Sequence, residues 1–174
     1  ALFGPLDVGQ IAPIGFCLVE KFSILLLSNN ELSLRLFPFA AGMVALPLAF
    51  LFAHRSVGPF CAVLCMAQLA VIPEAVYHAN NLKPYSLDLA IAIGLMLLAW
   101  GGGSVVCSRK KLLWLGFWGS IAPWFSFSAV FILFGIGATV MIRHTLSRYW
   151  RGLVLFSVVS LAWIFSFWLQ YRFL

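Results

Sequence analysis

Long apolar runs separated by short polar segments are the feature that most constrains how this chain folds. The runs at residues 32–53, 57–77, 85–107 and 152–169 are each close to the roughly 20 residues that a helix needs to cross a bilayer. Apolar residues make up 63% of the 174 residues and charged residues only 9%. A soluble domain of this size has too little interior to hide that much apolar surface. The pattern predicts an all-α, polytopic transmembrane helical bundle, and it excludes a soluble enzyme, a disordered chain and a disulfide-stapled secreted domain.

Two further segments are apolar but do not fit a simple span. Residues 11–28 carry Glu20 and Lys21 near their centre, and a charge pair is costly in the middle of a bilayer. We expect a helix that lies at the interface or is shielded inside the bundle. Residues 112–142 would extend about 45 Å as one straight helix, against a hydrocarbon core of about 30 Å. We expect two shorter helices that meet near Pro123.

The expected architecture is one transmembrane domain over residues 1–174. It contains about four full spans, a short-helix hairpin and an interfacial N-terminal helix. Pro38 and Pro47 fall inside the first span and are expected to bend it, and Pro73 falls near the far end of the second. Asn30 is a candidate cap for the first span.

Charged residues predict the orientation of this bundle. Arg55 and the basic clusters at 109–111 and 143–151 would lie in the cytoplasm under the positive-inside rule. The net charge of +6 is therefore a topology signal and does not indicate a nucleic-acid partner. We expect an integral membrane protein of the bacterial inner membrane with cytoplasmic basic loops. The acidic residues all fall toward the extracytoplasmic half: Asp7, Glu20, Glu31, Glu74 and Asp88.

Three outer segments, at residues 7–13, 31–38 and 74–88, hold most of the polar residues that topology does not explain. In one bundle they would converge on an outer cavity. Lys83 and Arg35 could then hold a phosphate, and Asp7, Glu74 or Asp88 could accept a proton.

Each of these residues also has a structural interpretation. Asp88 and Glu31 would stabilise helix N-termini, and Lys83 and Arg35 would be interfacial anchors. His78 would be a solvated loop residue. The sequence contains no zinc-ligand spacing, nucleotide-binding loop or nucleophile motif, so no metal site is predicted.

The order of several short motifs resembles the membrane glycosyltransferases of the GT-C fold. These motifs are Gln10-x-Ala-Pro13, Gly15-Phe16, Glu20-Lys21 and Glu31-Leu-x-Leu-Arg35-Leu-x-Pro38. They are similar to the first outer loop and following span of the protein O-mannosyltransferases and the lipid A aminoarabinose transferases. Residues 77–88 resemble the next outer loop of these enzymes, and residues 124–131 resemble their short-helix hairpin. The resemblance covers about residues 7–142.

The resemblance implies transfer of a sugar from a polyprenyl-phosphate carrier to an acceptor on the extracytoplasmic side. The polyprenyl-phosphate-linked sugar would be the donor, and membrane lipids, the carrier and other integral-membrane subunits would be the partners. Asp7, the only acid ahead of the Gln-x-Ala-Pro motif, would be the catalytic residue. The residues implied to bind the substrate or the lipid phosphate are Lys83, Tyr85, Gln10, Arg35 and His78.

Two interpretations of the chain stay open at the level of sequence. It is either a polyprenyl-phosphate-sugar-dependent glycosyltransferase, present as the N-terminal portion of a longer GT-C protein, or a truncated, non-catalytic GT-C-like accessory subunit. Such a subunit would pack lipid or protein within a larger integral-membrane complex. A transporter fragment is a third possibility, although no paired inverted repeat is visible.

Overall fold

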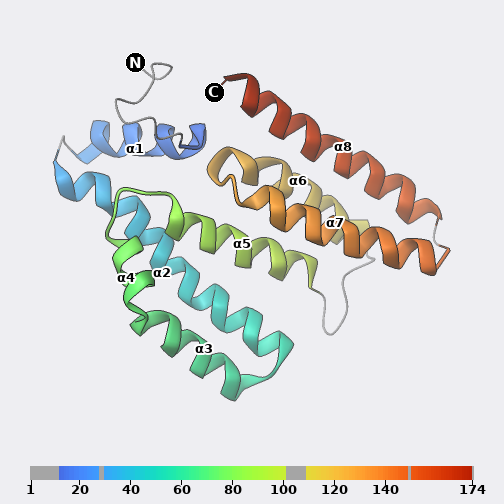
Figure 1. The fold of residues 1–174 in the computed structure, drawn as a ribbon, viewed down its shortest axis with the longest axis horizontal. Coiled ribbons are helices and arrows are strands. Elements are labelled where there is room, and N and C mark those ends of the chain that lie inside the picture. Colours follow the sequence, from blue (N-terminus) through green and yellow to red (C-terminus); the bar gives the residue numbers. More distant parts are fainter. Residues whose placement is uncertain (1–11, 28–29, 101–108, 149, 174) are drawn as a thin grey trace.

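The chain folds into a bundle of α-helices, as Figure 1 shows. The structure is a computed structural model that describes residues 12–27, 30–100, 109–148 and 150–173. The predicted all-α class is confirmed within these residues. The helices are α1 (Ile14–Leu27), α2 (Glu31–Ser56), α3 (Pro59–Val71), α4 (Pro73–Ala79), α5 (Tyr85–Ala99), α6 (Arg109–Phe125), α7 (Ala129–Leu146) and α8 (Trp150–Phe173).

Helix length and composition identify an integral membrane protein. Within the described residues, α2, α7 and the Gly152–Arg172 part of α8 are long and apolar enough to cross a membrane. The pair α3 and α4 makes a fourth candidate if the two count as one span. Large apolar side chains point outward, and Phe131 and Phe134 on α7 are each nearly 80% exposed. Such exposure is stable when lipid replaces water as the solvent.

The second expected span is broken. Instead of one helix over residues 57–77, α3 ends at Val71 and α4 begins at Pro73, with a bend of 62° between them. Pro73 is the first residue of α4, where its missing N–H costs no hydrogen bond. In contrast, α2 runs through Pro38 and Pro47 as a single helix. Asn30 caps α2 as predicted, because its side-chain oxygen accepts a hydrogen bond of 2.8 Å from the Ser33 N–H.

The third expected span, residues 85–107, is described in the structure only as far as Trp100. Helix α5 ends at Ala99, which gives it 15 residues and a length of about 22 Å. Residues 101–108 lie outside the described residues, so the expected end of this span is not tested.

Residues 112–142 form the expected pair of helices. The break comes at Ser126–Ser128, three residues after Pro123, and Pro123 lies in the last turns of α6. The two helices have 17 and 18 residues, and α7 is also long and apolar enough to be a candidate span.

Helix α2 packs against α5 through small residues. Its buried residues include four alanines spaced one turn apart, Ala41, Ala45, Ala49 and Ala53. Small side chains let helix backbones approach closely, which is the main source of packing energy between helices in lipid. This packing places α5 between α2 and the group α6–α8 (Figure 1).

The main hydrophobic core lies among α5, α6, α7 and α8, and it includes Leu95, Leu115, Leu133 and Trp163. Polar groups are paired across the α6–α8 contact. The Trp163 indole donates to the Gly116 carbonyl at 3.2 Å, and the Trp124 indole donates to Ser166 Oγ at 2.9 Å. These interhelical hydrogen bonds give the two indole N–H groups acceptors that the hydrocarbon of a lipid bilayer could not provide.

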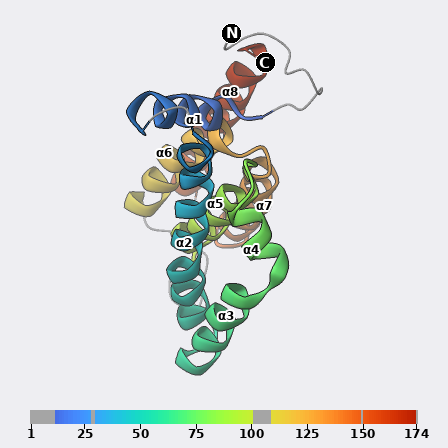
Figure 2. The same cartoon turned by 90° about the vertical axis from the view of Figure 1, so that its left-hand side faces the viewer.

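Helix α1 lies crosswise over one end of the bundle, at a large angle to α2, as Figure 2 shows. Phe16 anchors it, because its ring lies 6.0 Å from the Phe37 ring of α2. Glu20 follows one turn later and is buried. The crosswise position fits the expected interfacial helix, and burial of Glu20 fits the alternative of shielding by the bundle.

The connections between the helices lie at two opposite ends of the molecule. Helices α6 and α7 form a hairpin, so Arg109–Lys111 and the Arg143–Arg148 segment lie at the same end (Figure 1). The turn at 126–128 and the loop at 80–84 lie toward the opposite end, near α1. This relative arrangement is the one that the basic clusters predicted.

Candidate functional site

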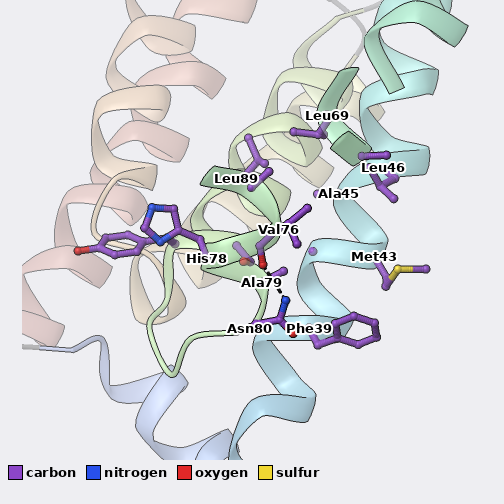
Figure 3. A pocket seen from close by; sticks show the side chains of 15 residues that line it. Phe39, Met43, Ala45, Leu46, Leu69, Val76, His78, Ala79, Asn80 and Leu89 are labelled. Carbon is purple, nitrogen blue, oxygen red and sulfur yellow. Dashed lines mark hydrogen bonds between the residues drawn. The ribbon is translucent and has the colours of Figure 1, made fainter. Parts of the chain in front are cut away.

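An apolar cavity of about 270 Å³ lies where α2, α3, α4 and α5 meet. It lies beside the break between α3 and α4, where the chain bends by 62°, and both of these helices contribute to its lining. Figure 3 shows the side chains that line it, with Phe39, Met43 and Leu46 from α2 and Leu69 from α3. Such a lining fits a hydrocarbon chain better than a polar metabolite.

The cavity has one polar end, formed by His78, Asn80, Tyr85 and Ser86. The His78 ring lies 4.7 Å from the Tyr85 ring in an edge-to-face contact, and Lys83 Nζ lies 5.7 Å from the centre of the same Tyr85 ring. Lys83, Tyr85 and His78 therefore form a continuous row from an exposed cation to the cavity. Within the described residues, His78 Nδ1 and Ser86 Oγ are buried without a hydrogen-bond partner.

The loop between α4 and α5 positions Lys83. The side-chain amides of Asn80 and Asn81 donate to the carbonyls of Val76 and Tyr77, at 2.8 Å and 3.1 Å. Both carbonyls also accept from the backbone N–H of Asn80, at 3.3 Å and 3.2 Å, so side-chain and backbone donors together cap the end of α4. Pro84 then begins the next helix, and its carbonyl accepts from the Asp88 N–H at 2.8 Å. The turn is held at both sides, so Lys83 stays beside Tyr85.

The structure brings together three of the predicted binding residues and separates a fourth. Tyr85 and His78 line the polar end of the cavity, and Lys83 lies beside Tyr85 without lining the cavity itself. Arg35 does not line the cavity, and its guanidinium donates to the Glu31 carboxylate at 2.7 Å, one turn away on α2. The predicted residues Asp7 and Gln10 lie outside the described residues.

The acidic candidates have structural partners or lie outside the cavity. The Asp88 side chain is partly buried at the start of α5, and its Oδ1 is buried without a hydrogen-bond partner among the described residues. Glu74 is exposed in the first turn of α4, where a carboxylate stabilises the helix N-terminus. Neither residue lines the cavity.

Sequence reasoning missed the α2 wall of the cavity. Gly42 lines it, and a Cβ at this position would lie 2.9 Å from the Ala79 Cβ of α4. Gly42 therefore permits the close approach of α4 that shapes the cavity. Gly42 stands out in the sequence as a glycine inside an apolar run. The sequence does not show that Ala79 of another helix packs against it. Among the described residues, no group of His, Cys, Asp and Glu side chains could hold a metal ion.

No protein-family model matches this chain, and searches of curated proteins and of solved structures found no match.

Proposed function

We propose that this chain is the carrier-binding portion of a polyprenyl-phosphate-sugar-dependent membrane glycosyltransferase that acts on the extracytoplasmic side. The observation that carries the proposal is the row of Lys83, Tyr85 and His78 at the polar end of an apolar cavity. A polyprenyl phosphate has the same two parts, an anionic head and a long apolar chain. The resemblance of residues 7–142 to GT-C enzymes independently favours the same ligand.

Each part of the ligand has a matching part of the site. The Lys83 ammonium would pair with the phosphate, which is a charge-assisted interaction that strengthens away from water. The His78 imidazole and the Ser86 hydroxyl, buried without partners in the described part of the chain, would hydrogen-bond to polar atoms next to the phosphate. The first isoprene units would lie against Phe39 and Met43 of α2.

The test compares a short-chain polyprenyl phosphate with the corresponding polyprenol, using the purified chain in detergent. Lys83→Ala should weaken binding of the phosphate by about tenfold or more and leave binding of the alcohol unchanged. Lys83→Arg should retain part of the phosphate affinity. Ala75→Leu, which adds volume to the cavity wall, should weaken binding of both ligands.

Controls separate a local effect of Lys83 from a loss of positive charge. Lys21→Ala removes an exposed lysine from α1 and should change neither affinity. Arg35→Ala should have a smaller effect than Lys83→Ala, because Glu31 already holds the Arg35 guanidinium. Unchanged phosphate binding by a folded Lys83→Ala variant would leave Lys83 as an interfacial anchor and overturn the proposed site.

A further inference from the structure

The second half of the chain carries positive charge without any acidic residue to balance it. Asp88 is the last acidic residue in the sequence. Helices α6, α7 and α8 therefore contain no carboxylate side chain that could neutralise their cations. The basic residues that follow Asp88 are Arg109, Lys110, Lys111, Arg143, Arg148, Arg151 and Arg172.

The fold gathers most of these cations at one end. Arg109, Lys110 and Lys111 begin α6, and Arg148 follows the end of α7. Because α6 and α7 form a hairpin, the two groups lie at the same end of the molecule (Figure 1). All four residues are exposed. We call these four residues the basic end.

Helix stability does not account for three of these cations. The N-terminus of a helix carries a partial positive charge, so Arg109, Lys110 and Lys111 each destabilise the first turn of α6. Adjacent like charges add repulsion. An external anion would relieve both effects.

Aromatic residues mark the depth of the basic end relative to the bilayer. Trp114, one turn into α6, is 57% exposed, and Trp150, the first residue of α8, is 73% exposed. Exposed tryptophans at helix ends are typical of the level of lipid headgroups. The cations therefore lie where the apolar surface of the helices begins.

We propose that the basic end binds the headgroups of anionic phospholipids. The cations would pair with lipid phosphates, and Trp114 and Trp150 would contact the adjoining glycerol and upper acyl chains. A lipid fits this surface better than a free phosphate ion, because only a lipid also covers the exposed apolar side chains. The surface lies at the opposite end from the Lys83 loop, so the inference does not depend on the carrier site.

The experiment measures which lipids the full chain retains. The purified chain is placed in micelles with equal amounts of phosphatidylglycerol and phosphatidylcholine, and bound lipids are counted by native mass spectrometry. We expect an excess of phosphatidylglycerol that falls at high salt, since screening weakens exposed charge pairs. The triple variant R109Q/K110Q/K111Q should reduce this excess by at least about fivefold.

Matched variants test whether the preference for phosphatidylglycerol arises at the basic end. The triple variant K21Q/R35Q/R172Q removes the same charge away from the basic end and should keep the excess. The swap R109K/K110R/K111R should also keep it and guards against misfolding as the explanation. Arg148→Asn should give a smaller reduction, and Asn suits the backbone φ of 52° at this position.

Three outcomes would overturn the inference. One is equal retention of the two lipids by the native chain. Another is an equal loss of preference in K21Q/R35Q/R172Q, which would show an effect of net charge alone. The third is displacement of the bound lipid by millimolar inorganic phosphate, which would indicate a site for free anions.

Discussion

Gly119 is the residue where the packing of α6 leaves the least room. A Cβ there would overlap the Trp163 indole and lie 2.9 Å from Leu133 Cδ2. Trp163 is buried and hydrogen-bonded to Gly116, so its ring cannot move freely. We expect Gly119→Ala to lower the free energy of unfolding by about 1–3 kcal/mol, measured by denaturation in detergent.

Gly135→Ala is the matched control, because no atom lies within 4 Å of a Cβ built at Gly135. This variant should be stabilised by about 0.5–1 kcal/mol through the lower backbone entropy of alanine. Equal effects of the two substitutions would contradict the close contact of Gly119 with Trp163.

Glu20 makes the docking of α1 sensitive to pH. Burial raises the pKa of its carboxyl from 4.5 to about 7, because the charged form is poorly solvated. The folded state therefore holds the proton more tightly than the unfolded state. The resulting stability is complete below pH 4.5 and is lost as the pH rises through about 7.

We expect the Tm of the purified chain to fall between about pH 5 and about pH 8, and Glu20→Gln to reduce this fall. Lys21→Gln, which alters an exposed neighbour on the same helix, serves as the control. If the Glu20→Gln variant loses as much stability over this range as the native chain, the buried carboxyl is not its source.

At the scale of the element, the hairpin of α6 and α7 makes a topological prediction. Both basic clusters should lie in the cytoplasm, and the 80–84 loop on the other side. A reporter that is active only outside the cytoplasm should be active after Asn81 and silent after Lys111 or His144. Different activities at Lys111 and His144 would mean that the intervening residues cross the membrane once.

Three of the prolines in apolar runs, Pro38, Pro47 and Pro73, show how far an element can be predicted. Pro38 and Pro47 lie inside the continuous helix α2, whereas Pro73 begins the new helix α4. The sequence marks all three positions as weak points, because proline removes one helical hydrogen bond. The packing of the surrounding helices decides which proline breaks its helix. The cavity lies beside the break at Pro73.

At the scale of the whole molecule, we expect the 174-residue chain to bind the carrier without transferring sugar. Transfer requires a base near the acceptor hydroxyl, and a positioned carboxylate is the expected group. None of the acids among the described residues lines the cavity. The measurement is sugar transfer from a polyprenyl-phosphate donor by the purified chain.

Transfer by this chain that Asp7→Asn abolishes would contradict the expectation and identify Asp7 as the base. Absence of both carrier binding and sugar transfer would instead favour an accessory subunit.

The sequence by itself determined the helical class, the membrane as solvent, the hairpin of α6 and α7 and the common end of the basic clusters. These follow from local quantities, namely the length of apolar runs and the position of charges relative to them. The resemblance carried by the sequence also implied Lys83, Tyr85 and His78 as binding residues, and the structure places these three side chains next to one another. The tertiary structure decided the break at Pro73, the pairing of Arg35 with Glu31 and the apolar wall contributed by α2. Each of these depends on which atoms of another turn or helix come within a few ångströms. A run of apolar residues carries little information about which residues pack against it in the folded protein.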